Sequence, residues 1–224
     1  MSGYQDETGI NPFYTFDTFD CEGIIELFTV LDSTDEDFSQ FLKDNPLIVK
    51  RISEQGIENP KHRRDIPWDD ANLIFIASKS TESNMHPPLG KGKSKERLGR
   101  IPLGEGNPIS YLLMYLKVPN NNDGEELFKL ISQLHSGFSK SIHGHEKFSI
   151  GKWGMSLEGY LLADEVIKLH KQLKKVKWSV SANEPLDGGV RTFANDLSII
   201  LRDAIKQKTG VVMRSHCWLK IISC

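Results

Sequence analysis

The segment VRTFANDLSIILRDAIKQKTGVVM, residues 190–213, predicts a long helix followed directly by a β-strand. Its apolar side chains recur at helical spacing, and Thr209 and Gly210 end the pattern. Residues 211–213 are strand formers, and residues 218–222 offer a second closing strand. A helix that leads into a strand through so short a connection is typical of folds that pack helices on a sheet. The apolar helical positions are Phe193, Leu197, Ile200, Leu201 and Ile205.

Helical spacing of apolar residues recurs upstream and predicts further helices. Ser33 and Glu36 have the spacing of a capping box at the start of one of them, and Asn107 with Pro108 has the pattern of a cap and first turn. We therefore predict an α+β (mixed α/β) fold, a single domain with about six or seven helices packed on a small sheet. The predicted helices upstream span residues 21–31, 33–45, 46–56, 107–116, 125–135 and 160–176.

Four other segments are candidates for strands. Residues 73–77, LIFIA, form a short apolar run that predicts a buried strand, although periodicity alone does not exclude a helix. Residues 4–20 alternate only in part and fit an edge strand or an irregular arm. Residues 178–180 predict a short strand, and residues 138–153 predict strand or loop.

The composition is that of an ordinary globular chain. Its 224 residues are 38% hydrophobic and 26% charged, which disfavours disordered, collagen-like and membrane classes. No apolar run approaches the roughly 18 residues of a membrane span, and the acidic start does not fit a signal peptide. Cys21, Cys217 and Cys224 lack the spacing of zinc or redox motifs and fit a reducing compartment. We expect a soluble cytoplasmic protein with no membrane partner.

Charge is distributed unevenly along the chain. Residues 1–50 carry eleven acidic and two basic side chains, a net charge of -9, whereas residues 161–224 have a net charge of +5. An acidic surface of this kind steers a basic partner, so we expect a basic protein partner and an inhibitor or immunity-type role. The alternative is that these carboxylates decorate the first turn of a helix. The candidate partner-binding residues are Asp32, Asp35, Glu36 and Asp37.

Two connections are rich in basic residues. Residues 58–70 are polar and proline-punctuated, with a basic run at 61–64. Residues 78–107 hold five glycines and three prolines and form either a functional loop or an internal boundary between two parts of the chain. Residues 92–94 match the end of a P-loop, but Pro87 occupies the position of its leading glycine. Without aromatic residues for base stacking, the loop makes nucleic acid an unlikely partner. Its candidate anion-binding residues are Lys91, Lys93, Lys95, Arg97 and Arg100.

A histidine cluster is the remaining candidate for chemistry. On a strand, His143 and His145 would share one face, so with Glu146 they are candidates for acid/base catalysis and with His135 for a metal site. Gly144 between them favours a turn as much as a strand, and surface histidines are the alternative.

Motifs that specify a reaction are missing from the sequence, which has no GxSxG, HExxH or strand-linked GxGxxG. The cofactor is therefore unknown and it stays open whether the protein is an enzyme. Two functions remain: a protein-interaction module with an acidic N-terminal part, and an enzyme or binding protein for a phosphorylated small molecule or nucleotide. The second would use the basic loop 90–106 together with His143 and His145.

Overall fold

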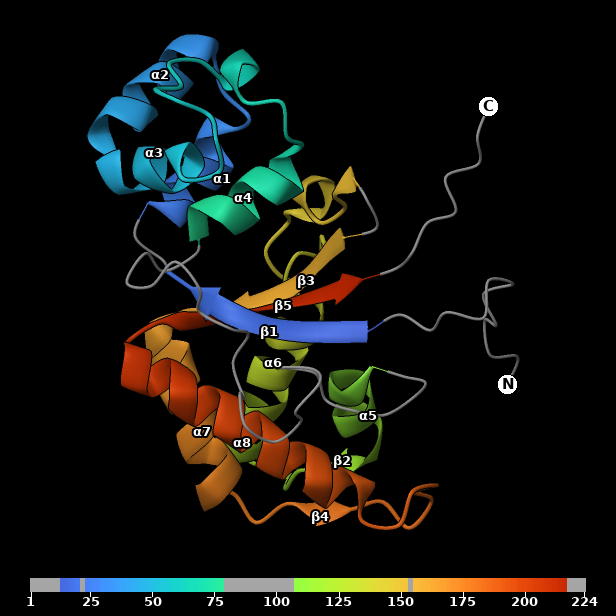
Figure 1. The fold of residues 1–224 in the computed structure, drawn as a ribbon. Helices are drawn as coiled ribbons and strands as arrows, with labels where there is room; N and C mark the ends of the chain where they lie inside the picture. Colours follow the sequence, from blue (N-terminus) through green and yellow to red (C-terminus); the bar gives the residue numbers. More distant parts are fainter. Residues whose placement is uncertain (1–12, 21–22, 79–106, 153–154, 217–224) are drawn as a thin grey trace, which may run out of the picture.

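The computed structural model describes residues 13–20, 23–78, 107–152 and 155–216 (Figure 1). These residues form the expected mixed α+β fold, with eight α-helices and two small antiparallel sheets. No helix in these ranges is long and apolar enough to cross a membrane. Nearly all of the alternative boundary at 78–107 lies outside the described residues, as do residues 218–222.

The larger sheet has three strands in the order β1-β5-β3. Strand β5 (Gly210–His216) lies in the centre and pairs antiparallel with both β1 (Phe13–Phe19) and β3 (Met155–Leu161). The chain between 13 and 19 is thus the edge strand that its partial alternation suggested. The second sheet pairs β2 (Leu116–Lys117) with β4 (Ser179–Val180), as the sequence at 178–180 predicted.

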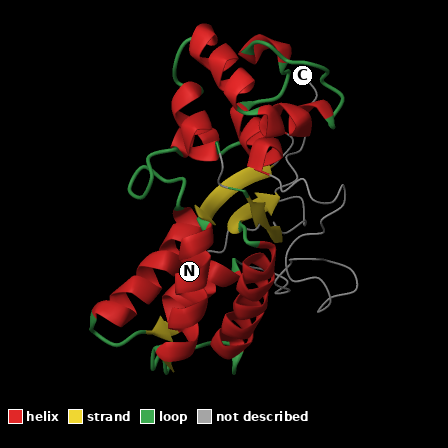
Figure 2. Ribbon diagram, turned by 90° about the vertical axis from the view of Figure 1, so that its left-hand side faces the viewer, coloured by secondary structure: helices red, strands yellow, loops and turns green. Residues whose placement is uncertain are grey.

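Helices cover both faces of the three-stranded sheet, so the sheet is the middle of three layers (Figures 1 and 2). Adjacent residues of β5 point to opposite faces: Val212 packs with the first helical layer, and Val211 and Met213 pack with the second. The first layer contains α1 (Ile24–Val30), α2 (Asp35–Asp44), α3 (Pro46–Ser53) and α4 (Asp70–Ser78). The second contains α5 (Pro108–Tyr115), α6 (Asn122–Ser136), α7 (Ala163–Lys175) and α8 (Gly189–Gln207).

The prediction of a buried strand at residues 73–77 is wrong, because these residues lie in helix α4. This helix is apolar almost all round: Leu73, Ile74 and Phe75 are all buried. A helix buried on every side has no polar face, so its sequence lacks the 3.6-residue period and resembles a buried strand. The described residues contain eight α-helices, where six or seven were expected, and α4 is the additional helix.

Strand β3 was not anticipated, since the helical spacing after Tyr160 predicted a helix from that residue onward. The helix, α7, instead begins at Ala163, and Tyr160 lies in β3, where it stacks on Phe19 with ring centroids 4.9 Å apart. A β-bulge between Leu157 and Gly159 shifts the pairing of β3 with β5. This irregularity obscures the period-two alternation that would have indicated a strand.

Polar contacts fix the first helical layer. Arg51 of α3 is 4% exposed, and its guanidinium donates to the carbonyl of Ala77 at the end of α4 and to the carboxylate of Asp20 after β1. Arg63 of the short 3-10 helix η1 (Arg63–Asp65) donates to the carboxylate of Asp70 at 2.7 Å. These contacts join α3 and η1 to α4.

Candidate functional site

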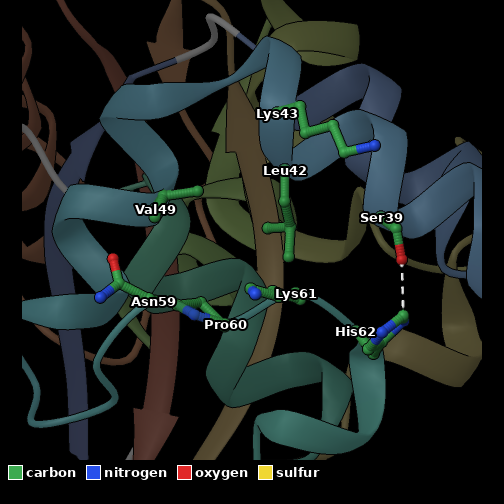
Figure 3. Close-up of a pocket in the computed structure, with 8 residues that line it drawn as sticks. All are labelled: Ser39, Leu42, Lys43, Val49, Asn59, Pro60, Lys61 and His62. Carbon is green, nitrogen blue, oxygen red and sulfur yellow. Dashed lines mark hydrogen bonds between the residues drawn. The ribbon is translucent and has the colours of Figure 1, made fainter.

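A pocket of about 540 Å³ opens in the first helical layer between α2, α3 and the segment that leads into η1 (Figure 3). Figure 3 shows that residues far apart in the sequence contribute to it. Its lining residues are Ser39, Leu42 and Lys43 from α2, Val49 from α3, and Asn59, Pro60, Lys61 and His62 from the connecting segment.

The amphipathic pattern of α2 brings its residues to this pocket. Phe38 and Phe41 are buried in the core, which leaves Ser39 and Lys43, four residues apart, on the side that faces the connecting segment. The helix begins with a capping box in which Asp37 N–H donates to the Thr34 hydroxyl at 3.2 Å. This box lies one residue later than the predicted pair Ser33 and Glu36.

A carboxylate fixes the other wall of the pocket. Asp65 of η1 accepts hydrogen bonds from the backbone N–H groups of Lys61 and His62, both at 2.9 Å. These two bonds lower the pKa of the Asp65 carboxyl. Asn59 has a φ of 48°, in the left-handed region that asparagine tolerates, and so turns the chain towards Pro60. The pocket wall is therefore built by local backbone contacts.

One hydrogen bond joins the two walls. Ser39 Oγ lies 3.0 Å from His62 Nδ1 (Figure 3), and the same hydroxyl donates to the carbonyl of Asp35 at 2.7 Å. A serine hydroxyl has one hydrogen, so in this arrangement it accepts from His62 Nδ1–H. The serine proton is engaged by the helix backbone, which does not suit a nucleophile activated by His62.

The charged groups at the pocket are positive. Lys43 and Lys61 are exposed and make no ion pair with any residue that the structure describes. Among the described residues that line the pocket there is no aspartate or glutamate. Leu42, Val49 and Pro60 supply an apolar wall. The arrangement suits a ligand with an anionic group and an apolar part, since two ammonium groups offer donors and the wall offers contact area.

The predicted histidine site has a different structure from the one expected. His143 and His145 lie in a turn, with Gly144 between them at a φ of 73°, and not on a strand. Their ring centroids are 6.3 Å apart; His143 stacks on Tyr160 at 4.9 Å and His145 on Phe28 at 4.2 Å. Burial lowers the pKa of both imidazoles.

These histidines do not assemble a metal site with the other candidates. His135 lies near the end of α6, where burial lowers its pKa, and Glu146 is exposed at the start of the 3-10 helix η2 (Glu146–Phe148). Within the described ranges, no group of three or more histidine, cysteine, aspartate or glutamate side chains is placed to hold a metal ion. The stacked rings of His143 and His145 instead attach their turn to the aromatic core.

The four acidic candidates divide into two pairs. Asp32 forms an ion pair with Lys147, and Asp37 is part of the cap of α2, where its hydrogen bonds with Thr34 lower its pKa. Asp35 and Glu36 are exposed in the first turn of α2, and neither forms an ion pair within the described part of the chain. Asp35 and Glu36 are thus the two of these candidates without such a contact among the described residues.

The five basic candidates of the loop, Lys91, Lys93, Lys95, Arg97 and Arg100, lie outside the described residues. The pocket itself was not predicted. Its only signals in the sequence were the basic run at 61–64, which was interpreted as a connection, and the isolated Lys43. Nothing in a single sequence indicates that residues about twenty positions apart, such as Ser39 and His62, meet at 3.0 Å.

In comparisons with protein families, with curated proteins and with solved structures, nothing matches this chain.

Proposed function

We propose that this protein binds small molecules that carry an anionic group and an apolar part, in the pocket between α2, α3 and residues 59–62. One observation carries the proposal: Lys43 and Lys61, neither of them in an ion pair with any described residue, share a pocket that has an apolar wall and no carboxylate among its described lining residues. The pocket volume of about 540 Å³ also lies within the usual range of ligand sites, roughly 300–1,000 Å³.

The polar groups of the pocket support binding in preference to hydrolysis. The Ser39 hydroxyl donates its hydrogen bond to a helix carbonyl, so it is not activated as a nucleophile. The lysines act as donors to an anion, and Leu42 and Val49 contact the apolar part of the ligand. Each charge-assisted hydrogen bond contributes about 1.5–3 kcal/mol, which is roughly tenfold or more in affinity.

Titration calorimetry with phenyl phosphate and benzoate tests this proposal. Both probes combine an aromatic ring with an anionic group of different charge. We expect saturable binding of at least one of them, and a loss of about tenfold or more in the variant Lys43→Ala/Lys61→Ala. Lys140→Ala, which removes an exposed lysine that does not line the pocket, is the matched control and should bind like the wild type.

The proposal fails if neither probe binds the folded wild-type protein at millimolar concentration. It also fails if the double lysine variant, folded by circular dichroism, binds as well as Lys140→Ala does.

A second candidate function is a protein-interaction module that docks on a basic partner, in an inhibitor or immunity-type role. The observation in its favour is that Asp35 and Glu36 are exposed and make no ion pair within the described ranges. A decalysine peptide is a direct probe, and its association should weaken steeply as salt shortens the Debye length below about 10 Å. Association that is insensitive to salt, or unchanged in Asp35→Asn/Glu36→Gln, argues against this function.

A further inference from the structure

Residues 138–151, which we call the strap, lie along the outer edge of β3. The Phe138 N–H donates to the carbonyl of Glu158 at 3.1 Å, and the Leu157 N–H donates to the carbonyl of Ser149 at 2.6 Å. An isolated antiparallel bridge joins the same two segments. Strand β3 is at one edge of the three-stranded sheet, and unpaired backbone groups at such an edge are a template for pairing with another chain. The strap therefore covers part of an edge that would otherwise be open.

Two histidines attach the middle of the strap to the rest of the molecule. His143 stacks on Tyr160 of β3 with ring centroids 4.9 Å apart, and His145 stacks on Phe28 of α1 at 4.2 Å. Nε2 of His143 is buried and has no hydrogen-bond partner among the described residues. An imidazolium carries a donor on both ring nitrogens, and a buried donor without a partner is costly. These surroundings therefore suit a neutral imidazole.

Two charged groups act on His143. The carboxylate of Glu165 in α7 favours the imidazolium, but it already accepts a hydrogen bond from the Gln133 amide at 2.7 Å. The ammonium group of Lys129 in α6 opposes the imidazolium. Burial has the largest effect, and it lowers the pKa of His143.

His145 faces a second imidazole. Its ring centroid lies 6.3 Å from that of His143, so a proton on one ring disfavours a proton on the other, while the Glu146 carboxylate favours it. Burial again has the largest effect and lowers the pKa of His145. The neighbouring Lys147 is in an ion pair with Asp32, which follows α1. Both histidines are therefore neutral at neutral pH while the strap is in place.

We propose that the strap is a pH-dependent cover for the edge of β3, and that it is released when His143 and His145 bind protons. The protons come from solvent, each adds to the free ring nitrogen of a neutral imidazole, and no covalent bond breaks. Release exposes Tyr160 and Phe28 and leaves backbone groups of β3 available to another strand. Because burial lowers both pKa values, the attached strap is favoured above the unfolded pKa of about 6.5 and is lost as the pH falls. This inference does not depend on the anion-binding pocket.

Hydrogen exchange of individual amides, followed by NMR, tests the inference. The amides of Phe138, His143 and Leu157 donate within the strap or between the strap and β3, so they report its release. Lowering the pH from about 7.5 to about 5.5 should reduce their protection factors, which are corrected for the intrinsic effect of pH, by up to about tenfold for each histidine that gains a proton. Exchange through strap release should not respond to small additions of urea, whereas the amides of α8 should exchange through global unfolding and respond strongly.

The variant His143→Phe/His145→Phe keeps two aromatic rings in the strap and removes both titratable groups. We expect the loss of protection in acid to disappear at the strap amides, and each single variant to lose about half of it on a logarithmic scale. His170→Phe is the matched control, because burial also lowers the pKa of His170, which lies in α7 outside the strap; this variant should behave like the wild type. Glu158 acts in the opposite direction, since burial raises the pKa of its carboxyl, and it is the same in all variants.

Three results would overturn the inference. The first is exchange of the strap amides together with those of α8 and with the same urea dependence, because the strap then opens only when the whole chain unfolds. The second is a loss of protection in acid that persists in the double variant or, if that variant does not fold, in both single variants. The third is an NMR titration of the wild type in which the ring Cε1–H signals give both strap histidines a folded pKa of about 6.5 or higher.

Discussion

Replacing Gly159 by alanine tests the packing of the second helical layer on the sheet. Gly159 lies in β3 directly against the last turn of α6, and a Cβ added there would lie 2.2 Å from the carbonyl oxygen of Gln133 and 2.4 Å from that of Leu134. Both neighbours are helix backbone and cannot rotate away. The variant must therefore separate α6 from β3 or distort one of them.

The size of the clash sets the expected loss of stability. A carbon and a carbonyl oxygen approach to about 3.3 Å without strain, so α6 would have to retreat by roughly 1 Å along its contact with β3. Overpacking a rigid core costs typically about 1–3 kcal/mol. With backbone on both sides we expect at least about 3 kcal/mol, a large share of the roughly 5–15 kcal/mol that stabilises a domain. The melting temperature should fall by roughly 6–12 °C.

Urea denaturation followed by circular dichroism measures this loss. Gly56→Ala is the matched control, because Gly56 has a φ of 89° but no atom of the described residues lies within 4 Å of the added Cβ. Its cost is backbone strain alone, about 1–2 kcal/mol. If Gly159→Ala unfolds at the same urea concentration as the wild type, or is no worse than Gly56→Ala, then α6 does not press on β3 as described.

Three further predictions concern the polar contacts. Burial lowers the pKa of His143 and His145, so both imidazoles bind protons more readily in the unfolded chain. The free energy of unfolding should therefore fall as the pH drops below about 6.5. Urea midpoints that do not change between about pH 7.5 and 5.5 would contradict this. The carboxylate of Asp17 accepts hydrogen bonds from Arg214 at 2.7 and 2.8 Å in a largely buried pair. Asp17→Ala should therefore lower the free energy of unfolding by about 3–5 kcal/mol, and adding Arg214→Met should restore most of that loss. No recovery in the double variant would refute the pairing. Thr34→Ala removes the cap of α2 and should cost about 1 kcal/mol, whereas a capping role is excluded if the melting temperature is unchanged.

The helices and strands that could be predicted are those whose apolar pattern in the sequence matches the faces that are buried in the structure. Helix α8 is amphipathic and ends with the left-handed Lys208 before the strand at Gly210, and all of these features are local. Helix α4 was mistaken for a strand because its burial on all sides removes the periodic pattern. Strand β3 was hidden by its bulge and by the helical spacing that continues into α7.

The pocket was beyond local reasoning for a different reason. Its polar residues belong to a helix and to an irregular segment, and they meet through a tertiary contact, the hydrogen bond between Ser39 and His62, which no local pattern encodes. For the histidine pair, in contrast, the sequence did contain a signal. The pattern His143-Gly-His145 was visible, but the positive φ of Gly144 places both rings against aromatic core residues instead of side by side on a strand.

The net charge of a segment is a poor guide to the field at one point on its surface. The pocket lies in and beside residues 1–50, whose net charge of -9 suggested an acidic surface for a basic partner. Several of these carboxylates are engaged: Asp32 pairs with Lys147, and Asp44 accepts from the Gln40 amide at 3.0 Å. Exposed charges more than about 8–10 Å apart are largely screened at physiological salt, so the groups next to the pocket, namely Lys43, Lys61 and the neighbouring Asp65, matter more there than the net charge of the segment. An anionic ligand and a basic partner can therefore recognise different places on the same acidic helical layer.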